Sequence, residues 1–349
     1  MPPPRAPCIP PACAGHGEFV RSERGERTLP SMLTPLDDLP IGPDGFVLAR
    51  DVSRLHGERS SLARAVARGD LVRVERGAYV TSSVWAEARP WERFRLRCLA
   101  VARARPDAVL CHAAAAALWG VPLLGSARRV DVLARGPEAG RVSGAIHYRG
   151  TRDPDAHVVS LDGVLVTDLP RTLTELASRT SFAEGVVVMD WAAGPGVGGR
   201  SPRVAERLIH ECADELAVVR GARRLARVLN FADGRAASAG ESFSRVRMLE
   251  LGFAIPELQY EFRLDTGRRA VTDFRWTRQR IVGEFDGIAK YRAAEYRRGQ
   301  TPERIVVEEK LREDALRRKG EGVARWIWDD LWAPRRFASL LVEQGVPRA

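Results

Sequence analysis

The sequence contains few cysteines, almost no lysine and no long apolar run. None of the five cysteines pairs with histidines at a spacing typical of a metal site, so we expect buried, reduced thiols in a cytosolic protein. No run of about 18 apolar residues occurs, which argues against a membrane span. Residues 1–31 lack the apolar segment of a secretory signal. The sequence therefore predicts a cytoplasmic protein. The cysteines are Cys8, Cys13, Cys98, Cys111 and Cys212.

The scarcity of lysine accompanies a strong positive charge. The chain has 55 basic and 45 acidic residues, a net charge of +10, and its only lysines are Lys290, Lys310 and Lys319. This excess favours a polyanionic partner, most simply nucleic acid and in particular double-stranded DNA. The arginine bias, with abundant alanine and glycine, is also typical of a GC-rich bacterial genome. Part of the charge therefore has a second explanation in codon usage.

Residues 42–80 have the order of elements of a winged helix-turn-helix. Leu48, Val52 and Leu55 recur at helical spacing and predict a first helix. A second helix is expected over 62–68, and residues 71–80 alternate like a strand pair that turns at Arg76-Gly77. In such a module the second helix enters the major groove and arginines contact phosphates. The alternative is a small helical cap with a solvated basic face. The candidate DNA-binding residues are Arg59, Arg64, Arg68, Arg73 and Arg76.

The middle of the chain predicts an α+β region without recognisable chemistry. His112 begins an alanine-rich helix and is expected to pack or cap, because no partner base or nucleophile is evident. The glycine-rich loop 194–202 lacks the Gly-Lys-Ser ending of a phosphate-binding loop and is interpreted as a turn or linker. The expected helices are 91–105, 110–120, 173–177, 182–193 and 203–230, and the expected strands are 129–133, 145–149 and 164–167.

An acidic β-hairpin is the most informative feature of the sequence. Strand-type residues fill 270–276 and 281–286, and four loop residues separate them. Symmetric closure would set Trp276 against Ile281 and Asp273 against Glu284, with the Cβ atoms of the acids roughly 5 Å apart. Asp286 would share their face, because strand side chains alternate.

Opposed carboxylates destabilise a sheet but suit a divalent cation, so the hairpin predicts a Mg²⁺ site. Two alternatives remain. Arg275, Arg278 and Arg280 could neutralise the acids on an exposed surface. A register slip of one residue would send Asp273 to the other face.

The C-terminal motifs resemble the DUF559/Vsr-like branch of the PD-(D/E)XK endonucleases over about residues 238–332. They are Thr272-Asp-Phe274, Val282-Gly-Glu-Phe-Asp-Gly287 and Glu309-Lys-Leu-Arg-Glu-Asp-Ala-Leu316, followed by a glycine and an aromatic strand. The resemblance implies a restriction-endonuclease-like mixed sheet flanked by helices, and Mg²⁺-dependent hydrolysis of phosphodiester bonds.

The same resemblance assigns Asp273, Glu284 and Glu241 as metal ligands. Asp286 departs from the pattern, because it stands where the superfamily has lysine. Lys290 or Lys310 would then supply the catalytic cation. Glu241 has another explanation, since Ser238-Ala-Gly-Glu241 fits a capping box. The helix at 309–319 likewise fits an ordinary solvated face with one i,i+4 contact.

The N-terminal half is similar to the AbiEi group of antitoxins and transcriptional regulators. The similarity lies in Phe46 to Val80 and in the small-residue helix of Cys111 to Pro122. It implies a regulator within a toxin–antitoxin pair. The hypotheses are a DNA-binding endonuclease, a regulator with a catalytically inactive nuclease-like domain, and a protein-interaction module with no nucleic-acid partner.

Together these patterns predict an α/β protein, α+β overall, with two or three folded domains. The segments are a disordered tail (1–31, unless translation begins at Met32), a winged helix-turn-helix (32–85), an α+β middle domain (86–193), a linker and helix (194–237) and a nuclease-like domain (238–349).

Overall fold

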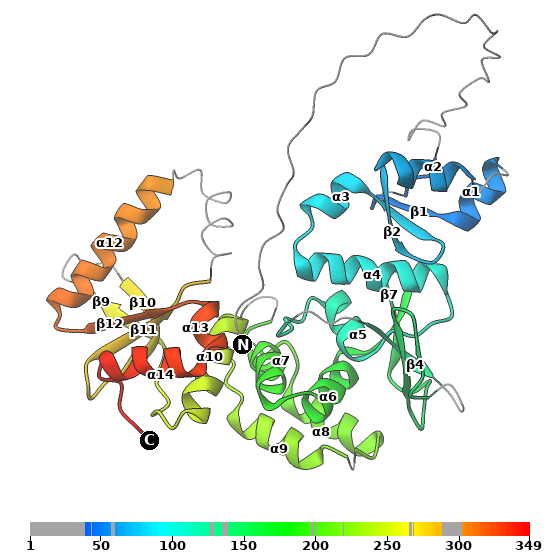
Figure 1. Ribbon diagram of the computed structural model, residues 1–349. Helices are drawn as coiled ribbons and strands as arrows, with labels where there is room; N and C mark the ends of the chain where they lie inside the picture. Colours follow the sequence, from blue (N-terminus) through cyan, green and yellow to red (C-terminus); the bar gives the residue numbers. More distant parts are fainter. Residues whose placement is uncertain are drawn as a thin grey trace, which may run out of the picture.

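Helices alternate with several small sheets in this α+β chain, which confirms the coarse fold class (Figure 1). The computed structural model describes residues 39–349, except residues 43, 57–59, 126–128, 135–138, 197–198, 200, 219, 265–266, 268 and 288–301. The predicted tail, 1–31, lies outside the described residues. Within the described part, no helix is long and apolar enough to cross a bilayer.

The N-terminal module is a three-stranded antiparallel sheet with two short helices. Its elements are β1 (Phe46–Leu48), α1 (Ala49–His56), α2 (Ser60–Arg68), β2 (Leu71–Glu75) and β3 (Ala78–Thr81), and the sheet order is β1-β3-β2. The prediction that Leu48 belongs to the first helix was wrong, because Leu48 ends β1 and pairs with Ala78. Phe46-Val-Leu48 is entirely buried, and a short apolar run does not distinguish a strand from a helix.

Helix α4 joins the N-terminal module to the middle of the chain. After α3 (Ser82–Glu87), α4 (Pro90–Ala104) runs beneath the sheet (Figure 1). Its Ala100 packs with Phe46 and Leu48 of β1. Its Phe94 and Val101 pack into the core of the middle region instead. One helix thus contributes to two apolar cores.

The middle region combines short strands with a group of helices. Parallel strands β4 and β6 lie beside the β7–β8 hairpin, and Leu110 bridges Val132 and Val166 between them. The single helix predicted over 203–230 is two helices, because Gly221 lies in the left-handed region at φ 93° and a Cβ there would overlap the carbonyl oxygen of Ser178. The elements are α5 (His112–Trp119), β4 (Val130–Ala134), β5 (Val142–Ser143), β6 (Ile146–Gly150), β7 (Val158–Leu161), β8 (Val164–Thr167), α6 (Leu169–Arg179), α7 (Phe182–Ala193), α8 (Glu206–Glu215) and α9 (Ala222–Phe231).

The C-terminal module is a four-stranded mixed sheet between helices. Its order is β12-β11-β10-β9, with β11 and β12 parallel and the other neighbours antiparallel. The last two helices were not predicted. The elements are α10 (Ala239–Glu250), β9 (Glu257–Arg263), β10 (Arg269–Trp276), β11 (Ile281–Phe285), α12 (Pro302–Arg318), β12 (Gly322–Trp326), α13 (Trp328–Trp332) and α14 (Pro334–Glu343).

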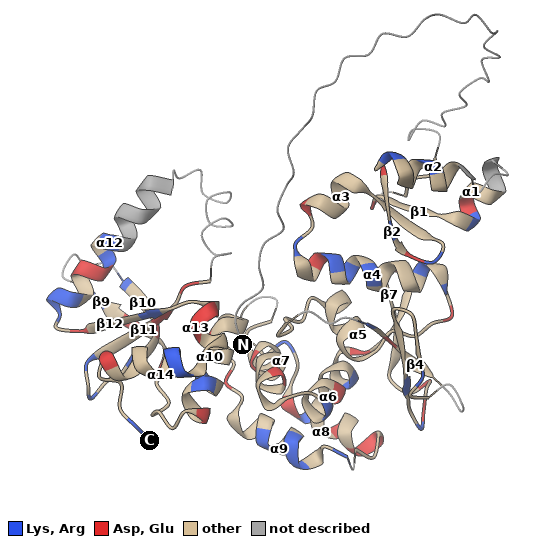
Figure 2. Ribbon diagram, in the orientation of Figure 1, with Lys and Arg blue, Asp and Glu red and all other residues tan. Residues whose placement is uncertain are grey.

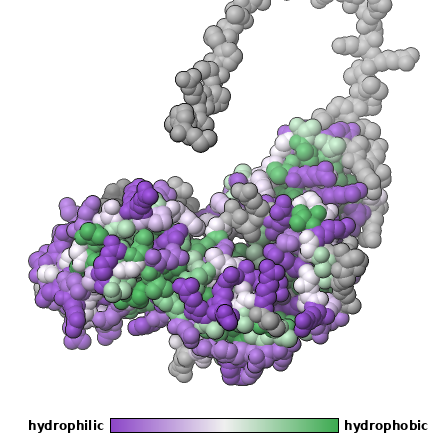
Figure 3. Space-filling model, turned by 60° about the horizontal axis from the view of Figure 1, so that its bottom comes forward, coloured by the Kyte–Doolittle hydropathy of each residue, from purple (hydrophilic) through white to green (hydrophobic). Residues whose placement is uncertain are grey.

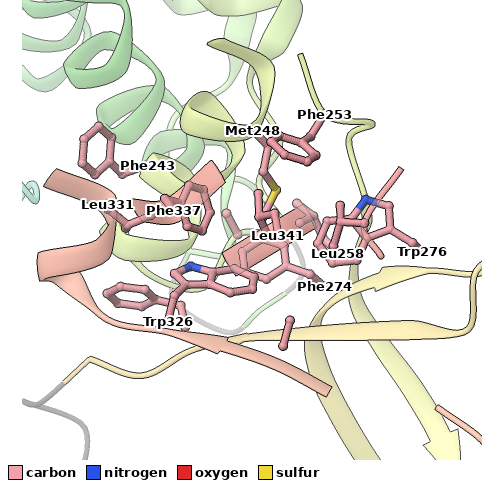
Figure 4. Close-up of a cluster of buried hydrophobic side chains, with 14 of the residues drawn as sticks. Phe243, Met248, Phe253, Leu258, Phe274, Trp276, Trp326, Leu331, Phe337 and Leu341 are labelled. Carbon is pink, nitrogen blue, oxygen red and sulfur yellow. The ribbon is translucent and has the colours of Figure 1, made fainter. Parts of the chain in front are cut away.

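Aromatic side chains fill the core of this module (Figure 4). Trp326 of β12 stacks on Phe274 of β10 at 5.2 Å and meets Phe337 of α14 edge-on at 5.4 Å. Its indole N–H donates to the Ser244 hydroxyl of α10 at 2.8 Å. A hydrogen-bonded, fully buried indole fixes the positions of the two strands against α10 and α14.

Helix α10, like α4, belongs to two cores. Its Phe243 and Met248 lie in the C-terminal core, whereas its Val246 packs with the middle region. A buried ion pair reinforces this contact: Arg245 of α10 donates to Asp190 of α7 at 2.7 Å. The predicted domain boundary between residues 237 and 238 therefore lies just before α10, a helix that packs against both the middle region and the C-terminal module. From below, hydrophilic side chains cover most of the C-terminal module and apolar ones show between them (Figure 3).

Candidate functional site

The acidic hairpin has the predicted register. Trp276 pairs with Ile281, Arg275 with Val282 and Phe274 with Gly283. The same register carried one residue further sets Asp273 across from Glu284. The alternative, a slip of one residue, does not occur, so both acids lie on the face of the sheet that α12 covers.

Two arginines hold Glu284 on that face. The carboxylate is buried, and its Oε2 accepts from Arg312 of α12 at 2.6 Å and lies 3.2 Å from Arg325 of β12. Arg325 is the parallel-sheet neighbour of Glu284 and also reaches Asp286 at 3.8 Å. It lies 3.3 Å from Glu313 of α12 as well. On this face of the sheet, acidic side chains alternate with arginines, and these arginines were not among the predicted site residues.

Asp273 has a backbone partner. It is half-buried, and its Oδ2 accepts from the Phe285 N–H at 2.9 Å. Arg275, on the same strand, is engaged by Glu321 at 2.9 Å and stacks over Tyr260. Arginines do neutralise Glu284, but the carboxylate is buried and its partners are Arg312 and Arg325, whereas the alternative named an exposed surface with Arg275, Arg278 and Arg280.

Glu241 closes the first turn of α10. The Ser238 hydroxyl accepts from the Glu241 N–H at 3.2 Å, and the buried Glu241 carboxylate accepts from Ala237 N–H at 2.8 Å. It also accepts from the Ser238 hydroxyl at 2.8 Å and from the Gln259 amide of β9 at 2.9 Å. The Ser238 half of the predicted capping box is present, whereas the Glu241 carboxylate accepts from the N–H of Ala237 rather than from that of Ser238. The contact with Gln259 also links Glu241 to β9, the neighbour of the strand β10 that carries Asp273.

The remaining predicted residues divide between exposed and undescribed positions. Lys290 and Arg59 lie outside the described residues, and Lys310 is exposed on α12. Lys and Arg positions are marked along the ribbon of the N-terminal module, for example on α2 (Figure 2). Arg68 lies 2.7 Å from Asp70, so part of its charge is neutralised within the module. The exposed arginines are Arg64 and Arg68 on α2, Arg73 on β2 and Arg76 in the β2–β3 turn.

A second polar cluster lies in the middle region, where no chemistry was predicted. Cys111, His112 and Glu175 are buried, and one potential ligand atom from each lies within 4.8 Å of the others. This cluster joins a cysteine to a histidine, an arrangement that the cysteine spacing had not suggested. Cys111 and His112 are adjacent in the sequence, but Glu175 comes from α6, and only the fold brings it to them.

Electrostatics stabilise the charged form of Glu175. Burial alone would raise its pKa, but the neighbouring His112 and Arg171 outweigh burial and lower the pKa to about 2. Burial raises the pKa of the Cys111 thiol well above its usual value. Of the four other cysteines, Cys98 and Cys212 lie in the described part of the chain and are buried free thiols, as predicted.

The fold and these two clusters define an α+β protein in which two shared helices join three modules. No family model matches the sequence. Two relatives from Mycobacterium tuberculosis, uncharacterized protein Rv2248 of strain H37Rv and uncharacterized protein MT2308 of strain CDC 1551, are each 31% identical over 231 residues. The match covers 66% of this chain and 79% of each relative. The chain belongs to the family of these mycobacterial proteins.

Proposed function

We propose that the protein is a DNA-binding regulator of the AbiEi type whose C-terminal module has a nuclease-like fold without nuclease activity. The arginine pair on Glu284 is the observation that supports this choice. In a metal-dependent nuclease this carboxylate would be a ligand for Mg²⁺, whereas here two guanidinium groups already neutralise one of its oxygens. Asp286, which stands where the endonucleases have a lysine, also supports a module without nuclease activity.

The arrangement of elements supports both halves of the proposal. In the N-terminal module two short helices precede a hairpin, and exposed arginines occur on α2 and at the hairpin turn, as a winged DNA-binding module requires. In the C-terminal module a helix, three antiparallel strands, a crossover helix and a parallel strand follow one another. A mixed sheet with this order of elements supports the endonuclease-like half of the proposal.

Salt dependence of DNA binding tests the proposal. Each phosphate contact contributes about −0.9 to the slope of log K against log salt concentration, so replacing both Arg64 and Arg68 by alanine should reduce the slope by about 2. The matched control is the pair Arg207→Ala and Arg223→Ala, which removes two exposed arginines from α8 and α9. Binding of the intact chain to a fluorescent duplex is measured by anisotropy, with EDTA present.

Wild-type binding that survives EDTA and weakens only in the α2 variant supports the proposal. Absence of binding at low salt, where attraction is strongest, would refute DNA binding. Equal weakening in both double variants would refute the assignment to the N-terminal module.

A Mg²⁺-dependent endonuclease is the second candidate, favoured by the register that opposes Asp273 and Glu284. Their carboxylate oxygens are ligands that suit Mg²⁺, with Glu241 as a third candidate. A bound Mg²⁺ would polarise the scissile phosphate and lower the pKa of an attacking water. Arg312 and Arg325 would have to release Glu284, and then Lys290 or Lys310 would stabilise charge on the phosphate.

Plasmid cleavage separates the two candidates. The regulator hypothesis expects no nicking with Mg²⁺ by wild type or by Glu284→Ala. Nicking by wild type that Glu284→Ala abolishes and Glu309→Ala retains would support the endonuclease instead.

A further inference from the structure

The cluster of Cys111, His112 and Glu175 brings three different metal-ligand chemistries together inside the protein. A thiol, an imidazole and a carboxylate each offer one atom within a sphere of a few ångströms. All three residues are buried: Cys111 is 0% exposed, His112 4% and Glu175 8%. A protein interior does not need such a group for packing, since small apolar side chains would fill the space without a desolvation cost.

His112 and Glu175 make one close electrostatic contact within the cluster. Nδ1 of His112 lies 3.0 Å from Oε2 of Glu175, but the contact lacks the direction of a hydrogen bond. Among the described residues, neither ring nitrogen of His112 has a hydrogen-bond partner, and neither has Oε2 of Glu175. Buried polar atoms without partners are rare in folded proteins and call for an explanation such as an ion.

The scaffold fixes these side chains before any ligand binds. Leu110 bridges β4 and β8, and the Cys111 N–H donates to the Asp131 carbonyl at 3.0 Å. His112 follows at the start of α5 with φ 47°, a strained conformation for a residue other than glycine. The cluster is therefore held at the junction of two strand pairs and a helix.

Glu175 is oriented by a second layer of contacts. Arg171, one turn earlier in α6, donates to Oε1 of Glu175 at 2.9 Å and leaves Oε2 facing His112. Arg171 is itself fully buried and donates to the Thr151 hydroxyl and to the carbonyls of Asp153 and Ala156. Such outer contacts, which fix the direction of a ligand, are characteristic of metal sites.

We propose that Cys111, His112 and Glu175 bind one Zn²⁺ ion. Zinc accepts sulfur, nitrogen and oxygen ligands together, and three protein ligands leave a fourth position for water or substrate. Magnesium is disfavoured here, because it binds oxygen almost exclusively. Binding displaces the Cys111 thiol proton to solvent, so a thiolate and a carboxylate balance the ion's two charges.

The fourth position has access to an external molecule. His112 and Glu175 line a cavity of about 580 Å³, and its mouth carries several exposed charged side chains. They are Arg152, Asp153, Arg179, Glu215 and Arg220. Three arginines against two acids favour a small anionic ligand on the open side of the ion.

Zinc and cobalt titrations of the untagged intact chain test the site. Chelator-treated wild type should bind one Zn²⁺ per chain and gain thermal stability with zinc concentration. Cys111→Ser should bind at least ~100-fold more weakly, the upper range for losing even a second-layer contact. Cys212→Ser, which alters a buried thiol outside the cluster, should bind like wild type.

A single-cysteine variant covers the case in which Cys111→Ser does not fold. With Cys8 and Cys13 replaced by serine and Cys98 and Cys212 by alanine, Cys111 is the only thiol in the chain. Co²⁺ should give this variant a thiolate charge-transfer band, and Glu175→Gln in the same background should weaken it. A wild type without stoichiometric zinc, a missing cobalt band, or zinc lost with Cys8 and Cys13 instead would each overturn the proposal.

Discussion

Replacing Asp190 by alanine should be among the most destabilising substitutions in the chain. Asp190 is 0% exposed and Arg245 5%, and the two side chains meet at 2.7 Å between α7 and α10. Asp190 also accepts from the Asp233 N–H at 2.7 Å, and Arg245 donates to the Phe231 carbonyl at 2.7 Å. Removing one partner of a buried pair leaves the other charge uncompensated, at a cost of about 3–5 kcal/mol.

Urea denaturation measures this loss as a shift of the unfolding midpoint. Glu250→Ala is the matched control, because it breaks the solvent-exposed Arg247–Glu250 pair on the same helix, which should contribute no more than about 1 kcal/mol. The double variant Asp190→Leu with Arg245→Met should recover most of the loss, since no charge then remains buried. A loss in Asp190→Ala no larger than in Glu250→Ala would refute the reasoning.

Burial of the Asp190 carboxylate has its own cost, which is visible in its pKa. Burial raises the pKa of Asp190 more than Arg245 lowers it. A carboxylate with a raised folded pKa contributes stability at low pH that is lost as the pH rises through that pKa. The wild type therefore loses some stability as the pH rises above 3.8, the ordinary pKa of the carboxyl group, whereas the hydrophobic double variant has no such group to titrate. The stability of the double variant relative to wild type should not fall between pH 5 and pH 7.

Two further predictions concern packing and titration. Gly283→Ala should lower the free energy of unfolding by about 1–3 kcal/mol in thermal or urea unfolding, because the new Cβ would lie 2.5 Å from the fixed Trp326 ring. Gly69→Ala is the control: its Cβ meets no atom within 4 Å, so it tests only the backbone strain at φ +83°. Equal losses in the two variants would contradict the packing argument. His157 lies 2.9 Å from Asp168 and 2.6 Å from Glu215; burial alone would lower its pKa, but hydrogen bonds to these carboxylates outweigh burial and raise it. Stability from a raised histidine pKa is present below about pH 6.5 and is lost as the pH rises through the folded value. His157→Gln should therefore destabilise the protein more at acidic than at alkaline pH, and a pH-independent loss would contradict this.

Local patterns predicted the hairpin well. A four-residue loop between two strand-type runs leaves one symmetric closure, so the pairing of Trp276 with Ile281 followed from the sequence. The cap at Ser238 and Glu241 also followed, because both residues lie within one helical turn. The boundary of β1 did not, since the buried triplet Phe46-Val-Leu48 fits either kind of element.

Contacts between distant segments could not be predicted. Arg312 reaches Glu284 from 28 residues along the chain, and Arg325 does so only because β12 returns parallel to β11. Glu175 meets Cys111 and His112 through the packing of α6 against the start of α5, for which no periodicity gives a signal. The sequence located one carboxylate pair correctly but missed the residues that neutralise it.

The sharing of α4 and α10 bears on how the chain can be dissected. A fragment that ended before α4 would lose the support under its sheet, and a fragment that began at α10 would carry Val246 to the solvent. Newly exposed apolar surface of this kind promotes aggregation. Each activity is therefore best sought by single substitutions in the full-length chain, because an inactive fragment would report on damaged packing rather than on the absence of a function.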